Sequence, residues 1–229
     1  MLTKKLLENA KKVISVELDT KMIDVLNERF KEHSNFILIN EDILKVNLKK
    51  LIKEEKEDAK NVKIVANLPY YITTPIIMKL LEDRLEIESI TVMVQREVAE
   101  RLVEKPGGKK TGAITYAINY YTIPQKVIDV PAESFIPAPE VCSSVINLEV
   151  LKIPAIKVIN EELLFKTIKI VFMQKRKTLL NGLNNGKILN KEEIKKMFSN
   201  LNINENIRGE KLSLEDFGKI ADYLEKNKN

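Results

Sequence analysis

Residues 63–81 read KIVANLPYYITTPIIMKLL, in which a short apolar strand is followed by a turn and then by a helix. The strand is Lys63–Asn67. Pro75 suits the first turn of the helix, because that turn leaves unused the backbone donor that proline lacks. Further runs of strand character lie at residues 13–18, 36–39, 89–94, 125–130 and 144–150. Strands that alternate with helices predict parallel βαβ units, and hence an α/β sheet with helices on both faces.

The last third of the chain differs, because only helical patterns follow Pro154. Ser213 and Asp216 have the spacing of a capping box for the last of these helices. We therefore predict an α/β domain over residues 1–153 and a small all-α domain over residues 154–229. Helices are expected at residues 95–103, 113–121, 161–172, 175–183, 191–198 and 213–224.

Composition excludes several kinds of site. Cys142 is the only cysteine and His33 the only histidine, so neither an internal disulfide nor a structural zinc site is available, and we expect no metal. A histidine-dependent triad would rest on His33 alone, which lies in a polar stretch. No apolar run approaches the length of a membrane span, and no secretory signal is evident at the first residues. We therefore expect a cytoplasmic protein that does not enter a membrane.

The net charge of +5 is unevenly distributed along the chain. Residues 1–153 carry 23 Lys and Arg against 23 Asp and Glu, whereas residues 154–229 carry 15 against 10. The second part thus supplies the whole excess. Such an excess indicates either contact with a nucleic acid or a general bias toward lysine.

Polar side chains stand at the ends of three predicted strands. Glu17 ends the first strand and could accept hydrogen bonds from both hydroxyls of a ribose. Asp42 follows the second strand and could accept from an adenine amino group, and Asn67 ends the third. A single acid at such a position is equally explained by solvent exposure. Because ligands bind at the carboxyl ends of strands in open parallel sheets, three polar ends in succession favour a nucleoside site.

Asn67-Leu68-Pro69-Tyr70 is the most specific short motif in the chain. The amino nitrogen of adenine is a poor nucleophile. The Asn67 side-chain oxygen and the Leu68 carbonyl could hold both amino hydrogens and favour the tetrahedral geometry that methyl transfer needs. Pro69 stiffens the turn, and Tyr70 could stack on an extruded base. The alternative interpretation is an Asn-Pro turn that closes a strand, with Tyr70 in the core.

With further motifs, the chain resembles the ribosomal RNA adenine dimethyltransferase family, which includes the kasugamycin-resistance dimethyladenosine transferase. The resemblance implies a Rossmann-like, S-adenosylmethionine-dependent methyltransferase fold that lacks its first strand, and a small helical RNA-binding domain. It covers essentially the whole chain. The segments that carry it are residues 11–19, 40–44, 67–77, 94–107, 135–144, 172–179 and 208–213.

The resemblance implies a role for each candidate site residue. Glu17 would bind the ribose of S-adenosylmethionine, Asp42 would bind its adenine, and Asn67 would lie between cofactor and target. Phe135 would hold the flipped adenosine opposite Tyr70, as expected for an enzyme that takes its base out of the stack. From the sequence alone, a loop aromatic that plugs the core is the better interpretation of Phe135.

Lys175, Arg176 and Lys177 would contact RNA phosphates, although three adjacent cations are more often a solvated helix end. The family reaction transfers two methyl groups to the N6 atom of each of two adjacent adenosines in small-subunit (16S) ribosomal RNA. The expected partner is the immature 30S particle, bound by a monomer. The alternatives are a large-subunit methylase of the macrolide-resistance type and a non-catalytic RNA-binding or ribosome assembly protein.

One departure from the family pattern concerns the segment that precedes Leu2 and Thr3 in family members. There we expect a strand and a glycine loop, Glu-x-Gly-x-Gly-x-Gly, whose glycines let the backbone approach the cofactor. That strand would lie between the strands containing Val13 and Ile64. Without it, we expect two exposed strand edges and a chain that neither binds the cofactor nor is active. A start codon assigned within the gene and a disrupted gene copy would each explain the departure.

Overall fold

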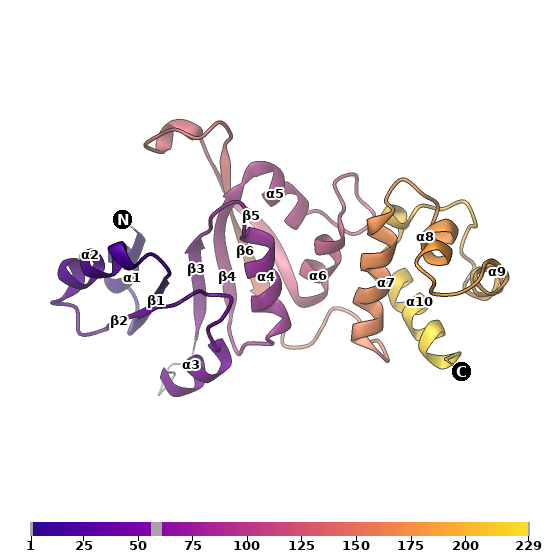
Figure 1. Cartoon of the computed structure of the whole chain (residues 1–229), viewed down its shortest axis with the longest axis horizontal. Helices are drawn as coiled ribbons and strands as arrows, with labels where there is room; N and C mark the ends of the chain where they lie inside the picture. The colour runs from indigo at the N-terminus through magenta and orange to yellow at the C-terminus, as the bar shows by residue number, and fades with distance from the viewer. Residues whose placement is uncertain (1, 56–60, 229) are drawn as a thin grey trace. The chain divides into compact units, whose positions relative to one another are not determined.

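The computed structural model describes residues 2–55 and 61–228, and Figure 1 shows their course. The chain divides into two compact units, Met1–Val62 with Pro75–Glu86, and Lys63–Thr74 with Ile87–Asn229. Within the described residues, no helix is long and apolar enough to cross a membrane. The strands are β1 (Val13–Glu17), β2 (Phe36–Asn40), β3 (Lys63–Asn67), β4 (Ser89–Gln95), β5 (Thr122–Val130) and β6 (Ser143–Val150).

The helices lie before, between and after these strands, and two short 3-10 turns accompany them. The helices that precede β5 are α1 (Leu2–Leu7), α2 (Thr20–Phe30), α3 (Leu48–Glu55), α4 (Thr73–Glu82), α5 (Arg96–Leu102) and α6 (Ala113–Tyr121). The later helices are α7 (Glu161–Met173), α8 (Leu179–Asn185), α9 (Lys191–Leu201) and α10 (Leu214–Lys226). The 3-10 turns are η1 (Ala132–Ser134) and η2 (Gly209–Lys211).

In the first unit, β1 and β2 form a parallel pair joined by α2, and Glu17 lies opposite Asn40 in their register. Asp19 caps α2, because its side chain accepts a hydrogen bond from the backbone N–H of Lys21 at 2.9 Å. The cap fixes the start of the helix directly after the strand. Leu7, Leu26 and Phe30 form a buried cluster in this unit.

In the second unit, the strands lie in the order β3-β4-β6-β5. Strand β3 is parallel to β4, whereas β6 is antiparallel to both β4 and β5. The register places Asn67 opposite Met93, and Ser143 opposite both Gln95 and Val130. The ends of β3, β4 and β5 therefore lie at the same edge of the sheet as the beginning of β6. We call this the carboxyl end of the sheet, and Figure 1 shows the η1 loop extending from it.

The predicted α/β class is confirmed, and the structure adds how the strands pair. Strands β1 and β3 belong to separate sheets, and each has one neighbouring strand among the described residues. The strand expected from Gln125 begins at Thr122 instead, so it includes Pro124. Proline is tolerated there because β5 lies at the edge of its sheet, where a missing backbone donor interrupts no inner ladder.

After Pro154 the described helical elements are α7 to α10 and η2, with no strand among them. The capping box expected from Ser213 and Asp216 is present at the start of α10. The helix expected over residues 175–183 was placed wrongly, because α8 begins at Leu179. Its first turn is capped by Thr178, whose hydroxyl accepts a hydrogen bond from the backbone N–H of Asn181 at 3.4 Å.

Aromatic rings join α6 to the later helices within the second unit. The Tyr116 ring lies 5.4 Å from that of Phe172 on α7 and 4.9 Å from that of Phe217 on α10, measured between centroids. Tyr116 and Phe217 are fully buried, and their rings meet edge to face, a favourable arrangement for aromatic pairs. The later helices thus share a packed interior with α6.

Candidate functional site

The turn after β3 carries the motif Asn67-Leu68-Pro69-Tyr70 at the carboxyl end of the sheet. Asn67 is the last strand residue and is exposed, while the Leu68 side chain is buried. The Leu68 N–H donates to the carbonyl oxygen of Met93 at 3.4 Å, which ties the turn to β4. Among the described residues, no hydrogen bond occupies the Asn67 side chain or the Leu68 carbonyl oxygen. Both acceptors named by the sequence are therefore available to a ligand.

Pro69 connects this turn to the following helix. Its carbonyl oxygen accepts hydrogen bonds from the backbone N–H of Ile72 at 3.2 Å and from the hydroxyl of Thr73 at 3.1 Å. Thr73 is the first residue of α4 and is buried. Because the proline ring fixes one backbone angle and these two bonds fix the next residues, the turn has little freedom to rearrange.

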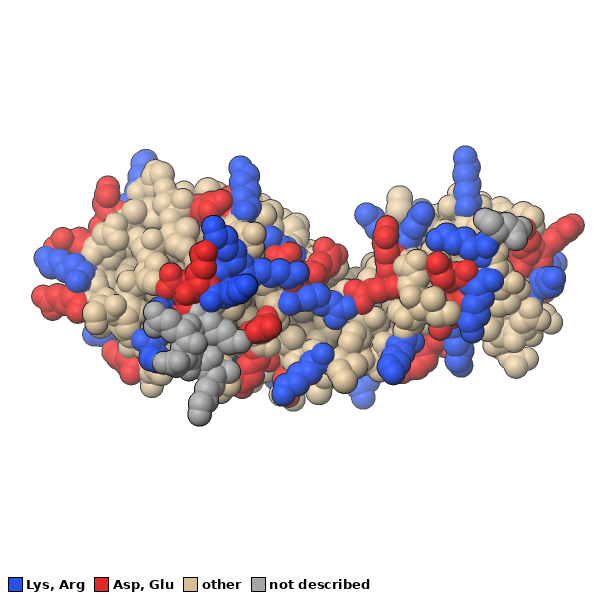
Figure 2. Space-filling view, turned by 90° about the horizontal axis from the view of Figure 1, so that it is seen from below, with Lys and Arg blue, Asp and Glu red and all other residues tan. Residues whose placement is uncertain are grey.

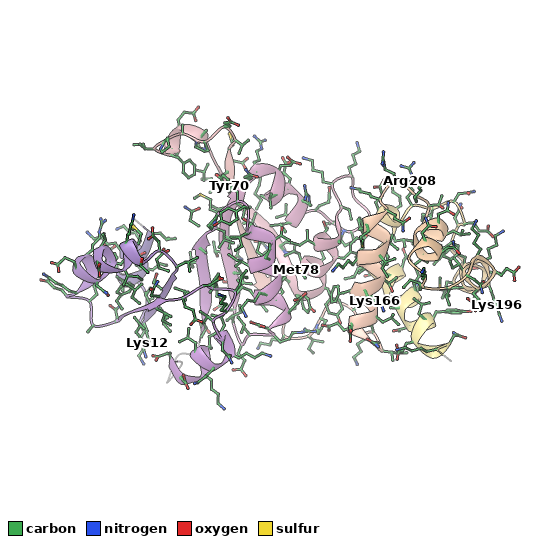
Figure 3. The ribbon with its side chains drawn as sticks, in the orientation of Figure 1. Lys12, Tyr70, Met78, Lys166, Lys196 and Arg208 are labelled. Carbon is green, nitrogen blue, oxygen red and sulfur yellow. The ribbon has the colours of Figure 1, made fainter. Side chains whose placement is uncertain are left out.

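The Tyr70 side chain is neither buried in the core nor free in solvent. Its hydroxyl lies 2.9 Å from the Ser143 hydroxyl, and the residue is 37% exposed (Figure 3). Ser143 is the first residue of β6 and is fully buried. The alternative that places Tyr70 in the core is therefore wrong, and Tyr70 keeps part of its surface for a ligand. Tyr71, which follows it, is 87% exposed.

Phe135 follows η1 in the loop that joins β5 to β6, so it shares the carboxyl end of the sheet with Tyr70. Its backbone N–H donates to the carbonyl oxygen of Ala132 at 3.1 Å, and the residue is half-buried. The following Ile136 is fully exposed and precedes a cis peptide bond to Pro137. That Phe135 faces Tyr70 across a bound base stays a prediction.

Glu17 and Asp42 belong to the first unit, at the carboxyl ends of β1 and β2. One oxygen of Glu17 accepts from the backbone N–H of Asp19 at 2.9 Å, and one oxygen of Asp42 accepts from that of Leu44 at 3.0 Å. The second oxygen of each carboxylate receives no hydrogen bond from a described residue. Asn40 donates to the Glu17 carbonyl oxygen at 2.9 Å and so fixes the strand end between them.

This donor set fits the nucleoside part of S-adenosylmethionine. Each carboxylate is oriented by a backbone N–H and retains one acceptor oxygen, as recognition of ribose hydroxyls and of an amino group requires. Both side chains are half-buried, so a bound nucleoside would find them partly desolvated. That Glu17 binds the ribose and Asp42 the adenine stays a prediction.

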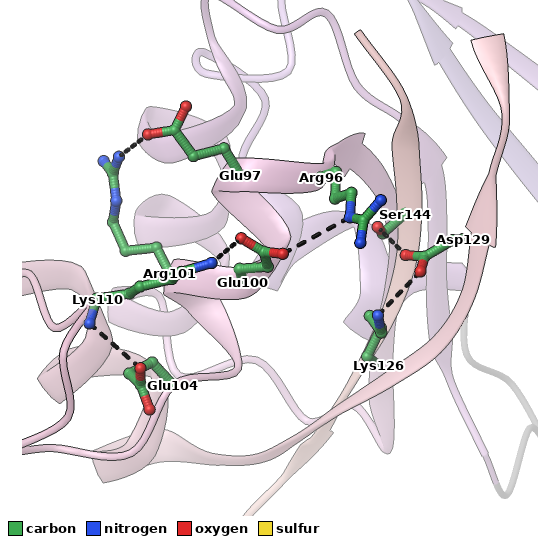
Figure 4. Close-up of polar contacts among 9 residues, drawn as sticks. All are labelled: Arg96, Glu97, Glu100, Arg101, Glu104, Lys110, Lys126, Asp129 and Ser144. Carbon is green, nitrogen blue, oxygen red and sulfur yellow. Dashed lines mark hydrogen bonds and ion pairs between the residues drawn. The ribbon is translucent and has the colours of Figure 1, made fainter.

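Ion pairs surround the start of α5 at the carboxyl end of the sheet (Figure 4). Glu100 is paired with Lys110 and with Arg96, the latter at 3.6 Å. The hydrogen bond from Lys110 lowers the pKa of Glu100, and the nearby positive charges act in the same direction. These charges pair with one another within the protein, and as partly exposed ion pairs they contribute little to stability.

A second set of contacts joins β5 to β6 in Figure 4. Asp129 accepts from the Ser144 hydroxyl at 2.6 Å and from Lys126 at 3.0 Å. The hydrogen bond from Ser144, followed by that from Lys126, lowers the pKa of Asp129. Ser143 and Ser144 are adjacent in a strand and use their hydroxyls on different partners, Tyr70 and Asp129.

The basic segment expected to bind RNA forms the turn between α7 and α8. Lys175 donates to the carbonyl oxygen of Thr111 at 3.0 Å and lies 3.8 Å from the Glu210 carboxylate. Arg176 and Lys177 are exposed and have no ion pair with a described residue. Lys175 therefore links two segments of the protein, while its two neighbours are available to solvent. On the face shown in Figure 2, Lys and Arg are interspersed with Asp and Glu.

Comparison with known proteins decides the family. The family model described as ribosomal RNA adenine dimethylase matches residues 1–226. This chain belongs to the ribosomal RNA adenine dimethylase family. Ribosomal RNA small subunit methyltransferase A of Alkaliphilus oremlandii is 45% identical over 226 residues, which cover 98% of this chain and 78% of that protein. The protein of the same name from Lachnoclostridium phytofermentans is 47% identical over 227 residues, with the same two coverages of 98% and 78%.

Solved structures agree with the family assignment. A dimethyladenosine transferase from Plasmodium falciparum superimposes with a TM-score of 0.76 at 27% identity, covering 99% of this chain and 86% of the other. The 23S rRNA methyltransferase ErmE gives a TM-score of 0.71 at 20% identity, covering 98% and 86%, a likeness that concerns the fold alone. The predicted Rossmann-like methyltransferase fold is confirmed.

The sequence motifs of the dimethylase family included Ser143 without indicating what it does. Its contact with Tyr70 joins residues 73 positions apart in the chain, and neither strand pattern predicts it. Fully exposed Ile136 and the structural bonds of Lys175 were likewise not anticipated. The available signal was the run of two serines after Cys142, since adjacent polar residues at the start of a predicted buried strand call for hydrogen-bond partners.

Proposed function

We propose that this protein transfers two methyl groups from S-adenosylmethionine to the N6 atom of each of two adjacent adenosines in small-subunit (16S) ribosomal RNA. Membership in the ribosomal RNA adenine dimethylase family supports the reaction. Relatives named Ribosomal RNA small subunit methyltransferase A, 45% and 47% identical, support the small-subunit substrate. The single observation that carries the proposal is the turn after β3, where the Asn67 side chain and the Leu68 carbonyl present unoccupied acceptors.

The cofactor supplies an electrophilic methyl group on a sulfonium. In the proposal, the free oxygen of Glu17 accepts hydrogen bonds from the ribose hydroxyls, and that of Asp42 accepts from the adenine amino group. The backbone N–H groups of Asp19 and Leu44 hold the two carboxylates in place before the ligand arrives. Preorganisation of this kind lowers the entropic cost of binding.

Asn67 and Leu68 act on the target nitrogen. Their two oxygens accept the two hydrogens of the adenine N6 amino group and draw its lone pair out of conjugation with the ring, which raises its nucleophilicity. No general base is needed before methyl transfer, because the methylated amine is cationic and loses a proton readily to water. The first product retains one N–H, so the same turn serves the second transfer.

The target adenine is extruded from the RNA and held by Tyr70 and Phe135, both at the carboxyl end of the sheet. Arg176 and Lys177, with Lys175 at the base of the same turn, contact phosphates of the RNA. We propose that a monomer performs this reaction in the cytoplasm on the immature 30S particle, during ribosome biogenesis.

The test measures transfer of labelled methyl groups to unmethylated small subunits and to large-subunit RNA, with digestion and mass spectrometry to identify N6,N6-dimethyladenosine. It uses the 229-residue chain and an extended chain, which carries ahead of Leu2 the strand and glycine loop, Glu-x-Gly-x-Gly-x-Gly, expected from the family pattern. Dimethyladenosine in the small-subunit RNA is the expected result. Methylation of large-subunit RNA alone, or RNA binding without transfer by both chains, would replace the proposal with one of the two alternatives.

A further inference from the structure

We propose that Ser143 is a positioning residue for methyl transfer, which holds the Tyr70 ring in the plane on which the target adenine stacks. This inference rests on the proposed function and adds to it a residue that does not touch the RNA or the cofactor. The observation behind it is the 2.9 Å contact between the Tyr70 and Ser143 hydroxyls.

Ser143 provides a rigid anchor. It is the first residue of β6, an inner strand, and lies in register with Gln95 on one side and Val130 on the other. It is fully buried, so its hydroxyl has few partners to choose from. Its position is therefore set by the ladders of two neighbouring strands.

Tyr70, in contrast, lies in a turn and needs an external restraint. Among the described residues, no aromatic ring contacts it, and the Ser143 hydroxyl is its side chain's hydrogen-bond partner. The backbone end of the side chain is fixed by the turn at Pro69, and the hydroxyl end is fixed by Ser143. A ring held at both ends is restrained in its rotation about the χ1 bond, yet at 37% exposure it still offers surface to a base.

A fixed ring plane matters because the reacting nitrogen must meet the methyl group in line. Misplacement of a reacting group by about 1 Å can reduce a rate by roughly a hundredfold. A stacked base follows the plane of the ring that it covers, so rotation of Tyr70 displaces the N6 atom relative to Asn67. Loss of the Ser143 hydroxyl should therefore lower the rate of transfer more than the affinity for RNA.

Ser144 offers a matched control. It is the next residue of β6, is also fully buried, and also uses its hydroxyl, which donates to Asp129 at 2.6 Å. Successive side chains of a strand point to opposite faces of the sheet, so Ser144→Ala removes a hydrogen bond away from Tyr70. That bond is the stronger of the two, because its acceptor is a carboxylate. A purely structural role for Ser143 predicts the same effect from both substitutions.

The experiment compares Ser143→Ala, Tyr70→Phe, their double variant and Ser144→Ala in the extended chain. Ser143→Ala and Tyr70→Phe should each lower kcat by roughly three- to tenfold, as expected for one neutral hydrogen bond, with KM for the RNA changed by less than about twofold. The double variant should be no slower than either single variant, because both remove the same bond. Ser144→Ala should keep the wild-type kcat.

A second measurement does not depend on catalysis. In the protein alone, NMR of ¹³C-labelled tyrosine should show faster motion of the Tyr70 ring in Ser143→Ala and unchanged motion in Ser144→Ala. If Ser143→Ala does not fold, Tyr70→Phe with ¹³C-labelled phenylalanine supplies the comparison, since its ring lacks the bond and should move faster than the wild-type Tyr70 ring. Unchanged ring motion together with wild-type kcat overturns the inference. A wild-type extended chain that methylates no RNA overturns the proposed function instead.

Discussion

The Tyr116 hydroxyl, on α6, donates a hydrogen bond of 2.7 Å to the carbonyl oxygen of Leu212, 96 residues further along the chain. Tyr116 is fully buried, and burial raises the pKa of its phenol well above the ordinary value of 10.0. Leu212 lies between η2 and α10, in the Arg208–Ser213 segment that the sequence marked as a family motif. This motif therefore serves as a docking point for α6.

Removal of this hydroxyl should destabilise the protein. Tyr116→Phe keeps the ring contacts but leaves the Leu212 carbonyl without its 2.7 Å partner, at a cost of about 1–3 kcal/mol in the free energy of unfolding. The melting temperature should fall by about 2–4 °C for each kcal/mol in a chain of this size. Thermal denaturation of the 229-residue chain checks this. Tyr223→Phe, which removes a hydroxyl bonded to an exposed partner, is the control and should change the melting temperature little.

The raised pKa of Tyr116 also predicts a pH dependence. Below pH 10 the phenol is neutral in both states and its stabilisation is complete. As the pH rises above 10.0, the unfolded phenol ionises while the folded one does not, so stability falls. Denaturant unfolding between pH 8 and about pH 11 should show a steeper loss for the wild type than for Tyr116→Phe. Equal slopes would contradict this origin of the pH dependence.

Glu17→Ala should weaken S-adenosylmethionine binding to the extended chain by roughly 1–3 kcal/mol, the scale of lost charge-assisted hydrogen bonds. Isothermal calorimetry measures this affinity directly. Glu41→Ala is a matched control, because Glu41 is an exposed acid at the same end of the β1–β2 pair. The backbone N–H of Glu41 donates to the Glu17 carbonyl oxygen, so the two acids are close neighbours. If Glu17→Ala binds S-adenosylmethionine as tightly as the wild type, Glu17 does not bind the ribose.

Asn67→Ala should lower methyl transfer by the extended chain about a hundredfold, on the scale seen when one donor or acceptor to a transition state is removed. RNA affinity should stay within about twofold, because this acceptor works chiefly in the transition state. Single-turnover kinetics and filter binding separate the two. Asn61→Ala, an exposed residue just before the opposite end of β3, should leave both quantities unchanged. A turnover within about twofold of wild type would exclude Asn67 from catalysis.

Neutralising Lys175, Arg176 and Lys177 together should weaken binding to immature small subunits and make its salt dependence shallower. Arg176→Ala and Lys177→Ala should each do so without a change in melting temperature. Lys175→Ala should also lower the melting temperature, because it removes the bonds to Thr111 and Glu210. Alanine at Lys195 and Lys196 on α9 (Figure 3) controls for the removal of charge alone. If the affinity for RNA depends on salt concentration as steeply as in the wild type, the RNA contacts another surface of the protein.

Local patterns were sufficient wherever one segment determines its own structure. Helix α6 has the bounds expected from its apolar spacing, and Ser213 and Asp216 form the expected cap, because each depends on residues within a few positions. The end of β3 at Asn67 was predicted for the same reason. The polar residues at the strand ends also pointed to Glu17 and Asp42 as candidate ligand-binding residues. In the structure each of these carboxylates keeps one oxygen without a hydrogen bond from a described residue.

Contacts between distant segments could not be read from the sequence. The strand predicted from Gln125 begins at Thr122, and the edge position of β5 explains why it can include Pro124. The partners of Lys175 are Thr111 and Glu210, which lie 64 and 35 positions away in the chain. The segment from Lys175 was predicted to begin a helix, but it is a turn in which this lysine makes structural bonds. In both cases, tertiary packing overrides the local preference.

The outer side of β5 has a consequence for how molecules behave at high concentration. The strand is interrupted by Pro124, which offers no donor, and by a bulge between Lys126 and Ile128. Together these break the regular row of backbone groups that a strand from another molecule would have to match. At this edge of the sheet, such a border disfavours pairing with a strand of another chain, the step by which regular exposed strands seed fibre-like polymers.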